Sequence, residues 1–402
     1  MTIPNFKGGS LFSRGMVAVL AAQFLSALAD NALLFAAIAL LKSQQAAAWQ
    51  TPLLQEAFVL AFILLAPFVG PFADHIPKGR AMLLANAMKL IGAAMMLSGA
   101  HPLLAYSLVG IGAAAYSPAK YGILRELVSA DKLVKANSLI EGSTIVAILL
   151  GAVLGGMLAD WSVQGALASV VGVYLLATLS NLLIPRLPAA HAQTQFSPAV
   201  LVRDFVRALR TLMRNRDARF SLLGTSVFWG AGSTLRFLLV AWVPVALLIT
   251  DNTMPATLSG VVAIGIALGA AAAARFVNLS NVNRALPGGI AIGLLIMVFA
   301  HVTSMPATVF MLILIGACGG FYVVPLNALL QERGYETVGA GHAIAVQNFF
   351  ENLTMLLMIG AYVLLIKSGI SVIAAATGFG ALVLLGIGVL AWGRLAQHAE
   401  IG

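Results

Sequence analysis

The sequence predicts an all-α integral membrane protein with twelve transmembrane helices. Its 402 residues are 60% hydrophobic and only 9% charged, whereas soluble domains are about 45–50% apolar and about 25% charged. The apolar residues form long runs between short charged loops, and the runs lack the alternation that is typical of a membrane β-barrel. An ordinary soluble enzyme and a disordered chain are therefore both excluded.

Twelve runs are long enough to cross a bilayer core of about 30 Å, which requires roughly 20 apolar residues in a helix. They cover about 15–41, 53–73, 80–99, 102–124, 136–159, 163–184, 220–249, 257–275, 286–304, 306–330, 343–366 and 370–393. The first run resembles a signal peptide, because Lys7 and Arg14 precede it and Ala27-Leu28-Ala29 imitates a cleavage site. Since its apolar stretch continues to Leu41, we interpret it as a mature helix.

The basic residues are distributed unequally between the two sides of the membrane. If both termini are cytoplasmic, only Lys42 and Lys367 of the 23 Lys and Arg residues fall outside. The inner set comprises Lys7, Arg14, Lys78, Arg80, Arg125, Lys132, Lys135, Arg186, Arg203, Arg207, Arg210, Arg214, Arg216, Arg219, Arg275, Arg284, Arg333 and Arg394. This asymmetry satisfies the positive-inside rule. The net charge of +9 therefore indicates membrane topology and not nucleic-acid binding.

The longest loop separates the sixth and seventh spans. Ser197-Pro198 is a typical helix start, since proline is tolerated in the first turn. Arginines then recur at helical spacing, opposite a set of apolar residues. The arginines are Arg203, Arg207, Arg210 and Arg214. The pattern predicts an amphipathic helix that is attracted to anionic lipid of the inner leaflet, and a plain linker that obeys the positive-inside rule is the alternative.

The two six-span halves carry similar motifs at similar positions. Ile111-Gly112-Ala113 and Pro118 in the fourth span resemble Ile315-Gly316-Ala317 and Pro325 in the tenth. A repeat of six helices is typical of transporters with two related halves. We therefore expect an N-terminal half at 1–185, a cytoplasmic linker at 186–219 and a C-terminal half at 220–402, with spans one, four, seven and ten facing a central cavity.

Six charged side chains lie well inside the predicted spans, away from their ends. They are Asp30, Lys89, Lys120, Glu141, Arg236 and Glu351. Each costs roughly 2.5–3.5 kcal/mol near a bilayer centre, so they must face the interior in pairs or face water. Their expected depths in the membrane favour Asp30–Arg236 and Lys120–Glu141 pairs. Lys89 and Glu351 then remain as a third pair. Structural locks between helices are the alternative to a functional site.

A site that offers both signs of charge suits a zwitterionic substrate with a phosphate group. Arginine binds phosphate through two parallel hydrogen bonds, and a carboxylate accepts hydrogen bonds from an ammonium group. The predicted head-group residues are Asp30, Lys120, Arg236, Glu351, Asn31 and Tyr116. Tyr121 and Gln347 are further polar candidates. We expect no catalytic residue, no metal site and no cofactor.

The loop between the second and third spans resembles the signature loop of the major facilitator superfamily. It reads Gly70-Pro-Phe-Ala-Asp74-His-Ile-Pro-Lys78-Gly-Arg80, and His75 and Pro77 depart from the family's usual arginine and glycine. In that family the aspartate pairs with basic groups to close the cytoplasmic side. The resemblance implies a gating role for Asp74, and the candidates for gating or charge pairing are Asp74, Lys78, Arg80, Lys89, Arg125, Glu126 and Glu141.

Longer stretches resemble the bacterial lysophospholipid transporter family across essentially the whole chain. They are residues 22–35, 113–124, 228–239 and 324–333. The resemblance implies the major facilitator superfamily fold, with two pseudo-symmetric six-helix halves. It further implies a flippase of the bacterial inner membrane that moves lysophosphatidylethanolamine and related lysophospholipids to the cytoplasmic leaflet. An acyltransferase/acyl-carrier-protein synthetase partner would re-acylate them there, without use of ATP by the transporter.

The sequence lacks the motifs that two other functions would require. The sequence has no Gly-Lys-Ser or Gly-Lys-Thr loop for an ATP-driven pump, and no His-x4-Asp pair for a membrane acyltransferase. The main alternative is a proton-coupled antiporter for drugs or small metabolites, with Asp30, Glu141 or Glu351 as its proton carrier. A scaffold for lipid enzymes that does not transport is a third possibility.

The acyl chain of a lysophospholipid must remain in lipid or in an apolar crevice, because exposure to water costs about 0.8 kcal/mol per methylene. Gly151 and Gly155 in the fifth span and Gly265 and Gly269 in the eighth are small. They suggest a lateral opening between these two spans, and tight helix packing is the alternative.

Overall fold

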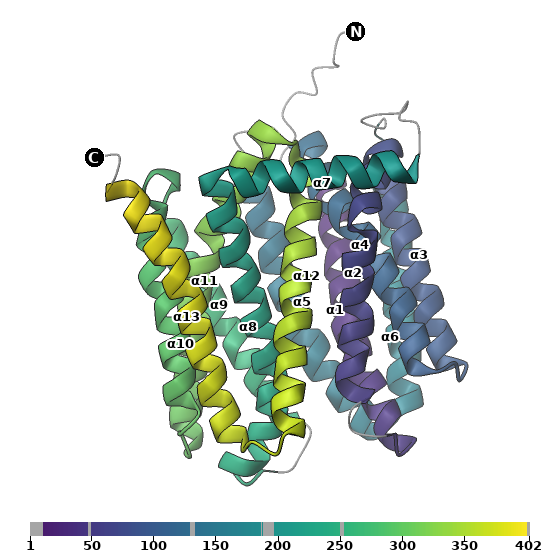
Figure 1. Cartoon of the computed structure of the whole chain (residues 1–402). Helices are drawn as coiled ribbons and strands as arrows, with labels where there is room; N and C mark the ends of the chain where they lie inside the picture. Colours follow the sequence, from purple (N-terminus) through teal and green to yellow (C-terminus); the bar gives the residue numbers. More distant parts are fainter. Residues whose placement is uncertain are drawn as a thin grey trace. The chain divides into compact units, whose positions relative to one another are not determined.

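A computed structural model describes residues 11–46, 50–128, 133–185, 187, 197–249 and 253–399. Within these ranges the chain forms thirteen α-helices and one short 3-10 helix, with no strand (Figure 1). The all-α prediction is therefore confirmed. The helices form two compact units, of which unit 1 extends to Phe205 and unit 2 begins at Val206.

Each unit contains six long helices that correspond to six predicted spans. In unit 1 they are α1 (Arg14–Ser43), α2 (Gln50–His75), α3 (Lys78–Leu97), α4 (Pro102–Leu127), α5 (Leu133–Trp161) and α6 (Val163–Leu182). The helix α7 (Pro198–Arg214) contains the boundary between the units. In unit 2 they are α8 (Arg216–Ala246), α9 (Thr253–Phe276), α10 (Leu286–Phe299), α11 (Met305–Thr337), α12 (Ala340–Lys367) and α13 (Val372–Ala399), and the 3-10 helix η2 (Leu279–Ala285) precedes α10.

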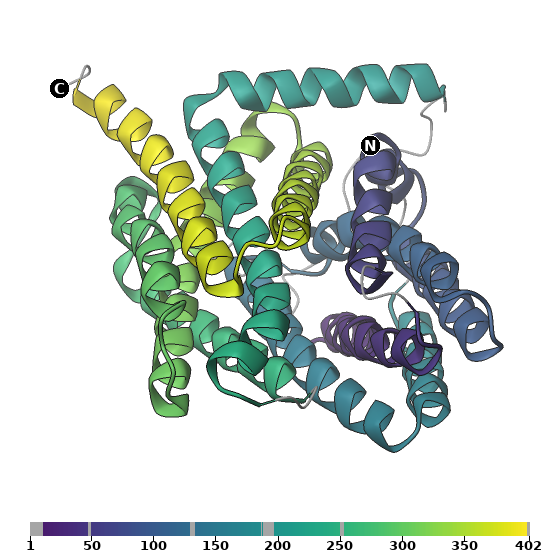
Figure 2. The ribbon, with the colours of Figure 1, turned by 60° about the horizontal axis from the view of Figure 1, so that its bottom comes forward.

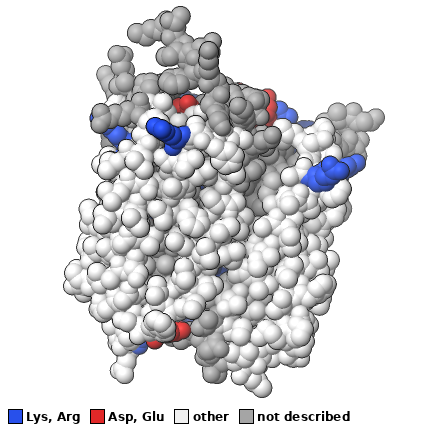
Figure 3. Space-filling model, turned by 180° about the vertical axis from the view of Figure 1, so that it is seen from behind, with Lys and Arg blue, Asp and Glu red and all other residues white. Residues whose placement is uncertain are grey.

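Eleven of the described helices are long and apolar enough to cross a membrane. The exception among the twelve predicted spans is α4, although it has 26 residues. Residues of low hydropathy such as Tyr116, Pro118 and Lys120 lower its average. Figure 3 shows one face of the molecule, on which the charged side chains gather near the two ends of the helices and uncharged residues fill the band between them.

Side chains at the helix starts satisfy backbone N–H groups that have no partner within the helix. Ser13 accepts from the backbone N–H of Met16 at the start of α1, and Ser162 does the same for Gly165 at the start of α6. Gly99, with φ of +95°, makes the turn between α3 and α4 possible, because side chains rarely adopt this conformation. These local signals place the breaks between consecutive spans.

Glycines bring pairs of helices into close contact within each unit. A methyl group at Gly155 of α5 would lie 2.7 Å from Ala32 Cα on α1, and one at Gly151 would lie 2.5 Å from Leu28 O on the same helix. Gly265 and Gly269 of α9 pack directly on the backbone of α11. These four glycines contact helices of their own unit, and the lateral opening between spans five and eight stays a prediction. Small residues permit such close packing between helices.

The predicted amphipathic segment forms α7, which lies across the direction of α8 (Figures 1 and 2). Its arginines Arg203, Arg207, Arg210 and Arg214 are exposed. Leu201, Phe205, Ala208 and Leu212 recur at helical spacing on the other face and are buried. Since α8 begins at Arg216, it includes residues that the sequence analysis assigned to the linker at 186–219.

The contact between α1 and α5 can be tested with two adjacent glycines. We expect Gly155→Ala to lower the free energy of unfolding by about 1–3 kcal/mol, because the new methyl group meets the α1 backbone. Gly156→Ala is the matched control, since a methyl group there meets no atom within 4 Å. Thermal unfolding in detergent micelles compares the two variants, and equal stability of both would contradict the described packing.

Candidate functional site

A buried ion pair lies among α1, α3 and α6 of unit 1. Lys89 Nζ on α3 donates to Asp30 Oδ2 on α1 over 2.8 Å. Tyr174 Oη on α6 donates to the other carboxylate oxygen, Asp30 Oδ1, over 2.6 Å. The side chain of Lys89 is 2% exposed and that of Asp30 is 21% exposed. Each buried charge thus has a counter-charge, which the low dielectric constant of a membrane interior requires.

Further polar groups extend this pair into a network. Lys89 also donates to Ser26 Oγ over 2.9 Å, and Ser26 in turn donates to Asn86 Oδ1 over 2.8 Å. The ammonium group of Lys89 lies 5.0 Å from the centre of the Tyr116 ring on α4. Asn86 Nδ2 and Tyr116 Oη are buried and have no hydrogen-bond partner among the described residues. Such groups are costly in a protein interior, by about 1–3 kcal/mol each.

Local sequence spacing and one glycine position this network. Ser26 and Asp30 are four residues apart on α1, and Asn86 and Lys89 are three apart on α3, so each pair shares one face of its helix. Gly112 on α4 leaves room for the stem of Lys89, because a methyl group there would lie 2.8 Å from Lys89 Cγ. The site therefore depends on close approach of α3 and α4.

The structure corrects the partner that depth alone suggested for Lys89. Its ion-pair partner is Asp30 and not Glu351. Many residues share one depth in the membrane, whereas the packing of both α1 and α3 on α6 selects the contact. The Asp30–Arg236 pair would join residues of the two units, and it stays a prediction. Arg236 lies on α8 and is half-buried.

A second polar cluster joins α11 and α12 within unit 2. Gln347 Nε2 donates to Glu351 Oε1 and to Asn327 Oδ1, each over 2.8 Å. Glu351 is buried, at 8% exposure. Gln347 and Glu351 are one helical turn apart, which the sequence makes visible. Asn327 was not recognised because it lies on another helix and is neutral.

Two other head-group candidates have contacts of different kinds. Lys120 is buried on α4, and its ammonium group lies 4.2 Å from the centre of the Tyr121 ring. Asn31 donates to Ala27 O of its own helix over 2.9 Å. The predicted Lys120–Glu141 pair is not tested, because the side chain of Glu141 lies outside the described residues.

Two of the predicted gating residues form an ion pair between α3 and α4. Lys78 Nζ, in the first turn of α3, lies 2.9 Å from Glu126 Oε1 near the end of α4. The side chain of Lys78 is buried, and Arg80 is exposed. The side chains of Asp74 and Arg125 lie outside the described residues. The pair links the two helices at the end where the predicted signature loop lies.

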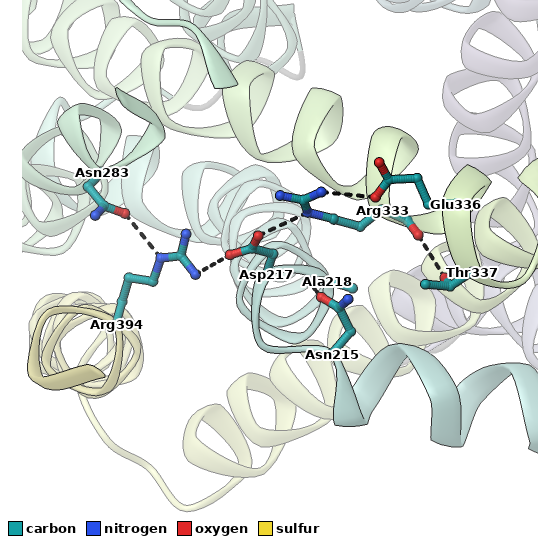
Figure 4. A network of polar contacts seen from close by, with 8 residues as sticks. All are labelled: Asn215, Asp217, Ala218, Asn283, Arg333, Glu336, Thr337 and Arg394. Carbon is teal, nitrogen blue, oxygen red and sulfur yellow. Dashed lines mark hydrogen bonds and ion pairs between the residues drawn. The ribbon is translucent and has the colours of Figure 1, made fainter. Parts of the chain in front are cut away.

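The sequence analysis missed an ionic cluster around Asp217 in unit 2 (Figure 4). Arg333 Nε on α11 donates to Asp217 Oδ2 over 2.9 Å, and Arg394 Nη1 on α13 donates to Asp217 Oδ1. Arg394 Nε also donates to Asn283 Oδ1 on η2 over 3.1 Å. One carboxylate thereby links α8, α11 and α13.

A local signal for this cluster exists in the sequence. Asn215 caps α8 by accepting from the backbone N–H of Ala218, and Asp217 follows in the first turn. An Asn cap followed by an acidic residue is a typical helix start, and the helix dipole favours a carboxylate there. Assigning residues up to 219 to the linker concealed this signal.

The fold and the paired intramembrane charges are those of a secondary transporter, and comparisons with known proteins agree. The sequence pattern of the Major Facilitator Superfamily matches residues 19–359 of this chain. The lysophospholipid transporter LplT of Klebsiella pneumoniae (strain 342) is 56% identical over 96% of this chain and 97% of its own length. That of Yersinia enterocolitica is 57% identical over 90% of both chains.

Solved structures show the same fold at low sequence identity. The human organic anion transporter MFSD10 has a TM-score of 0.75 at 17% identity, over 94% of this chain and 99% of its own. The Escherichia coli fucose:proton symporter FucP has a TM-score of 0.67 at 15% identity, over 94% and 98%. The chain therefore belongs to the major facilitator superfamily, and within it to the family of the LplT relatives.

The Asp30–Lys89 pair can be tested by a double-mutant cycle. We expect Lys89→Met to lower the free energy of unfolding by about 2–3 kcal/mol, somewhat less than for a fully buried pair because Asp30 is partly exposed. Adding Asp30→Asn should recover most of this loss, since the uncompensated charge is removed. Chemical denaturation in detergent measures all four proteins. Additive losses in the double variant would show that the two residues do not interact.

The Asp217 cluster can be tested against another acidic residue. We expect Asp217→Asn to destabilise the protein by about 1–3 kcal/mol, because two arginines share this carboxylate. Glu332→Gln on α11 is the control, since this residue is exposed and the change should alter stability by less than about 0.5 kcal/mol. Melting temperatures in detergent compare them, and an equal effect of both would contradict a special role for Asp217.

Proposed function

We propose that this protein is a lysophospholipid transporter that moves lysophosphatidylethanolamine and related lysophospholipids across the bacterial inner membrane to the cytoplasmic leaflet. The observation that carries this proposal is the 56–57% identity, over 90–96% of the chain, to proteins that are called lysophospholipid transporters. Transport proceeds by alternating access, the mode expected for a chain built from two related six-helix units.

The chemistry of the head group supports this substrate. Lysophosphatidylethanolamine carries a phosphate and an ammonium group, and the membrane-spanning helices carry charged groups of both signs. In unit 1, Asp30 accepts hydrogen bonds from the ammonium group, and Lys120, Asn31 and Tyr116 are further contacts. The proposal also includes Arg236 and Glu351 of unit 2, because a guanidinium group can hold phosphate oxygens through two parallel hydrogen bonds.

The orientation of the chain follows from its basic residues. Both termini are cytoplasmic in this proposal, which places Lys78, Arg80 and Glu126 on the inner side of the membrane. The Lys78–Glu126 pair ties α3 to α4 on this side. We include Asp74, Arg125 and Glu141 in the gating set because of their places in the sequence.

The product must be consumed on the cytoplasmic side. A lysophospholipid has one acyl chain, so an acyltransferase that uses an activated fatty acid converts it to a bilayer-forming phospholipid. An acyltransferase/acyl-carrier-protein synthetase partner would supply this reaction. The acyl tail remains in lipid during transport, because each methylene costs about 0.8 kcal/mol in water.

Reconstitution in liposomes tests the proposed function. We expect the purified protein to move labelled lysophosphatidylethanolamine from one leaflet to the other at a rate well above that of empty liposomes. The measurement is made with and without an imposed proton gradient, and with drugs and sugars as competing substrates. Movement of drugs or sugars without movement of lysophospholipid would contradict the proposal and favour a proton-coupled antiporter.

The head-group residues are tested in the same assay. We expect Asp30→Ala and Arg236→Ala each to reduce transport below about one tenth of the wild-type rate, because each removes a charged contact to the head group. Lys367→Ala, at the exposed end of α12, is the control for loss of a basic residue. Protein level and melting temperature are measured for each variant. A wild-type rate in either variant would remove that residue from the site.

A further inference from the structure

Two groups that hold Asp30 are themselves closed to any substrate. Tyr174 is fully buried, and the side chain of Lys89 is 2% exposed. Asp30 is 21% exposed. A head group can therefore reach Asp30 but neither of its two partners. Both carboxylate oxygens accept a hydrogen bond from a buried donor, Oδ1 from Tyr174 and Oδ2 from Lys89.

We propose that Tyr174 is a positioning residue of the head-group site, which acts together with Lys89 by fixing the orientation of the Asp30 carboxylate. This inference rests on the proposed function, in which Asp30 accepts hydrogen bonds from the substrate. Tethers from α6 and α3 hold the carboxylate in one rotamer, so its remaining lone pairs face the accessible side. An acceptor that is ordered in advance spares the substrate the entropic cost of ordering it on binding.

The surroundings of Lys89 keep this arrangement in place. In the described part of the chain, Lys89 contacts one negatively charged group, Asp30, together with Ser26 Oγ and the Tyr116 ring. Ser26 is committed as a donor to Asn86 Oδ1. Lys89 cannot leave Asp30 without losing its counter-charge in a buried site, so the carboxylate stays tethered on this side while the substrate binds.

The hydroxyl of Tyr174 can be removed without creating a cavity. In Tyr174→Phe the ring remains and Asp30 Oδ1 loses its donor, so the carboxylate can rotate about its side-chain bonds. We expect the KM for lysophosphatidylethanolamine to rise about tenfold in the liposome assay, which corresponds to a loss of about 1.4 kcal/mol in binding. The maximal rate should fall less than twofold, because Tyr174 is buried in the interior of α6 and acts through Asp30.

Tyr322→Phe is the matched control for loss of a buried hydroxyl. Tyr322 on α11 is also fully buried, and its hydroxyl has no hydrogen-bond partner among the described residues. We expect its KM and maximal rate to equal those of the wild type. Melting temperatures establish that both variants are folded. If Tyr174→Phe does not fold, Ser26→Ala serves instead, because it removes the second acceptor of Lys89, and it should raise KM about threefold.

The outcomes separate this inference from the proposed function. A higher KM in Tyr174→Phe, with a nearly unchanged maximal rate and a normal control, supports the positioning role. Unchanged KM and maximal rate in Tyr174→Phe would overturn the positioning role. Transport of lysophospholipid by the wild type would still uphold the proposed function. A lower maximal rate and melting temperature at constant KM would show a structural role and overturn the positioning role as well. If the wild type moves no lysophospholipid, both proposals fail.

Discussion

The requirement that charges inside a membrane be neutralised controls the structure of this protein. Asp30 and Lys89 would each cost several kcal/mol in a low-dielectric interior if their charges were not compensated. Lys89 Nζ lies 2.8 Å from Asp30 Oδ2, so each compensates the other. Their contact needs α3 to pack closely on α4, which Gly112 permits. Helix packing and charge pairing in unit 1 therefore depend on one another.

Unit 2 follows the same rule with different residues. Asp217 neutralises arginines from two other helices at the start of α8, and Glu351 receives a hydrogen bond from Gln347 within the span. The Asp30–Lys89, Lys78–Glu126 and Asp217–Arg394 ion pairs each join helices of one unit. A substrate with both signs of charge can then add to a neutral site without leaving an unpaired group behind.

The sequence predicts the helices better than it predicts the contacts between them. Long apolar runs, proline positions and cap residues are local signals, so all twelve predicted spans correspond to helices, and α7 forms where arginines and apolar residues alternate with helical period. The Lys89–Asp30 pair was not predicted because membrane depth does not distinguish among several opposite charges. Tyr174 was not singled out since, unlike Tyr116 and Tyr121, it has no charged residue near it in the sequence. Gly151 and Gly155 were ambiguous because small residues permit both separation and close packing of helices.

The central claim is that Asp30, held by Lys89 and Tyr174, is the acceptor for the ammonium group of the substrate. An experimental structure with bound lysophosphatidylethanolamine tests it most directly. The ammonium nitrogen should lie within about 3 Å of a carboxylate oxygen of Asp30, with the Lys89 and Tyr174 contacts intact. A head group bound away from Asp30, or a Lys89 that has left Asp30 to contact the lipid, would contradict it.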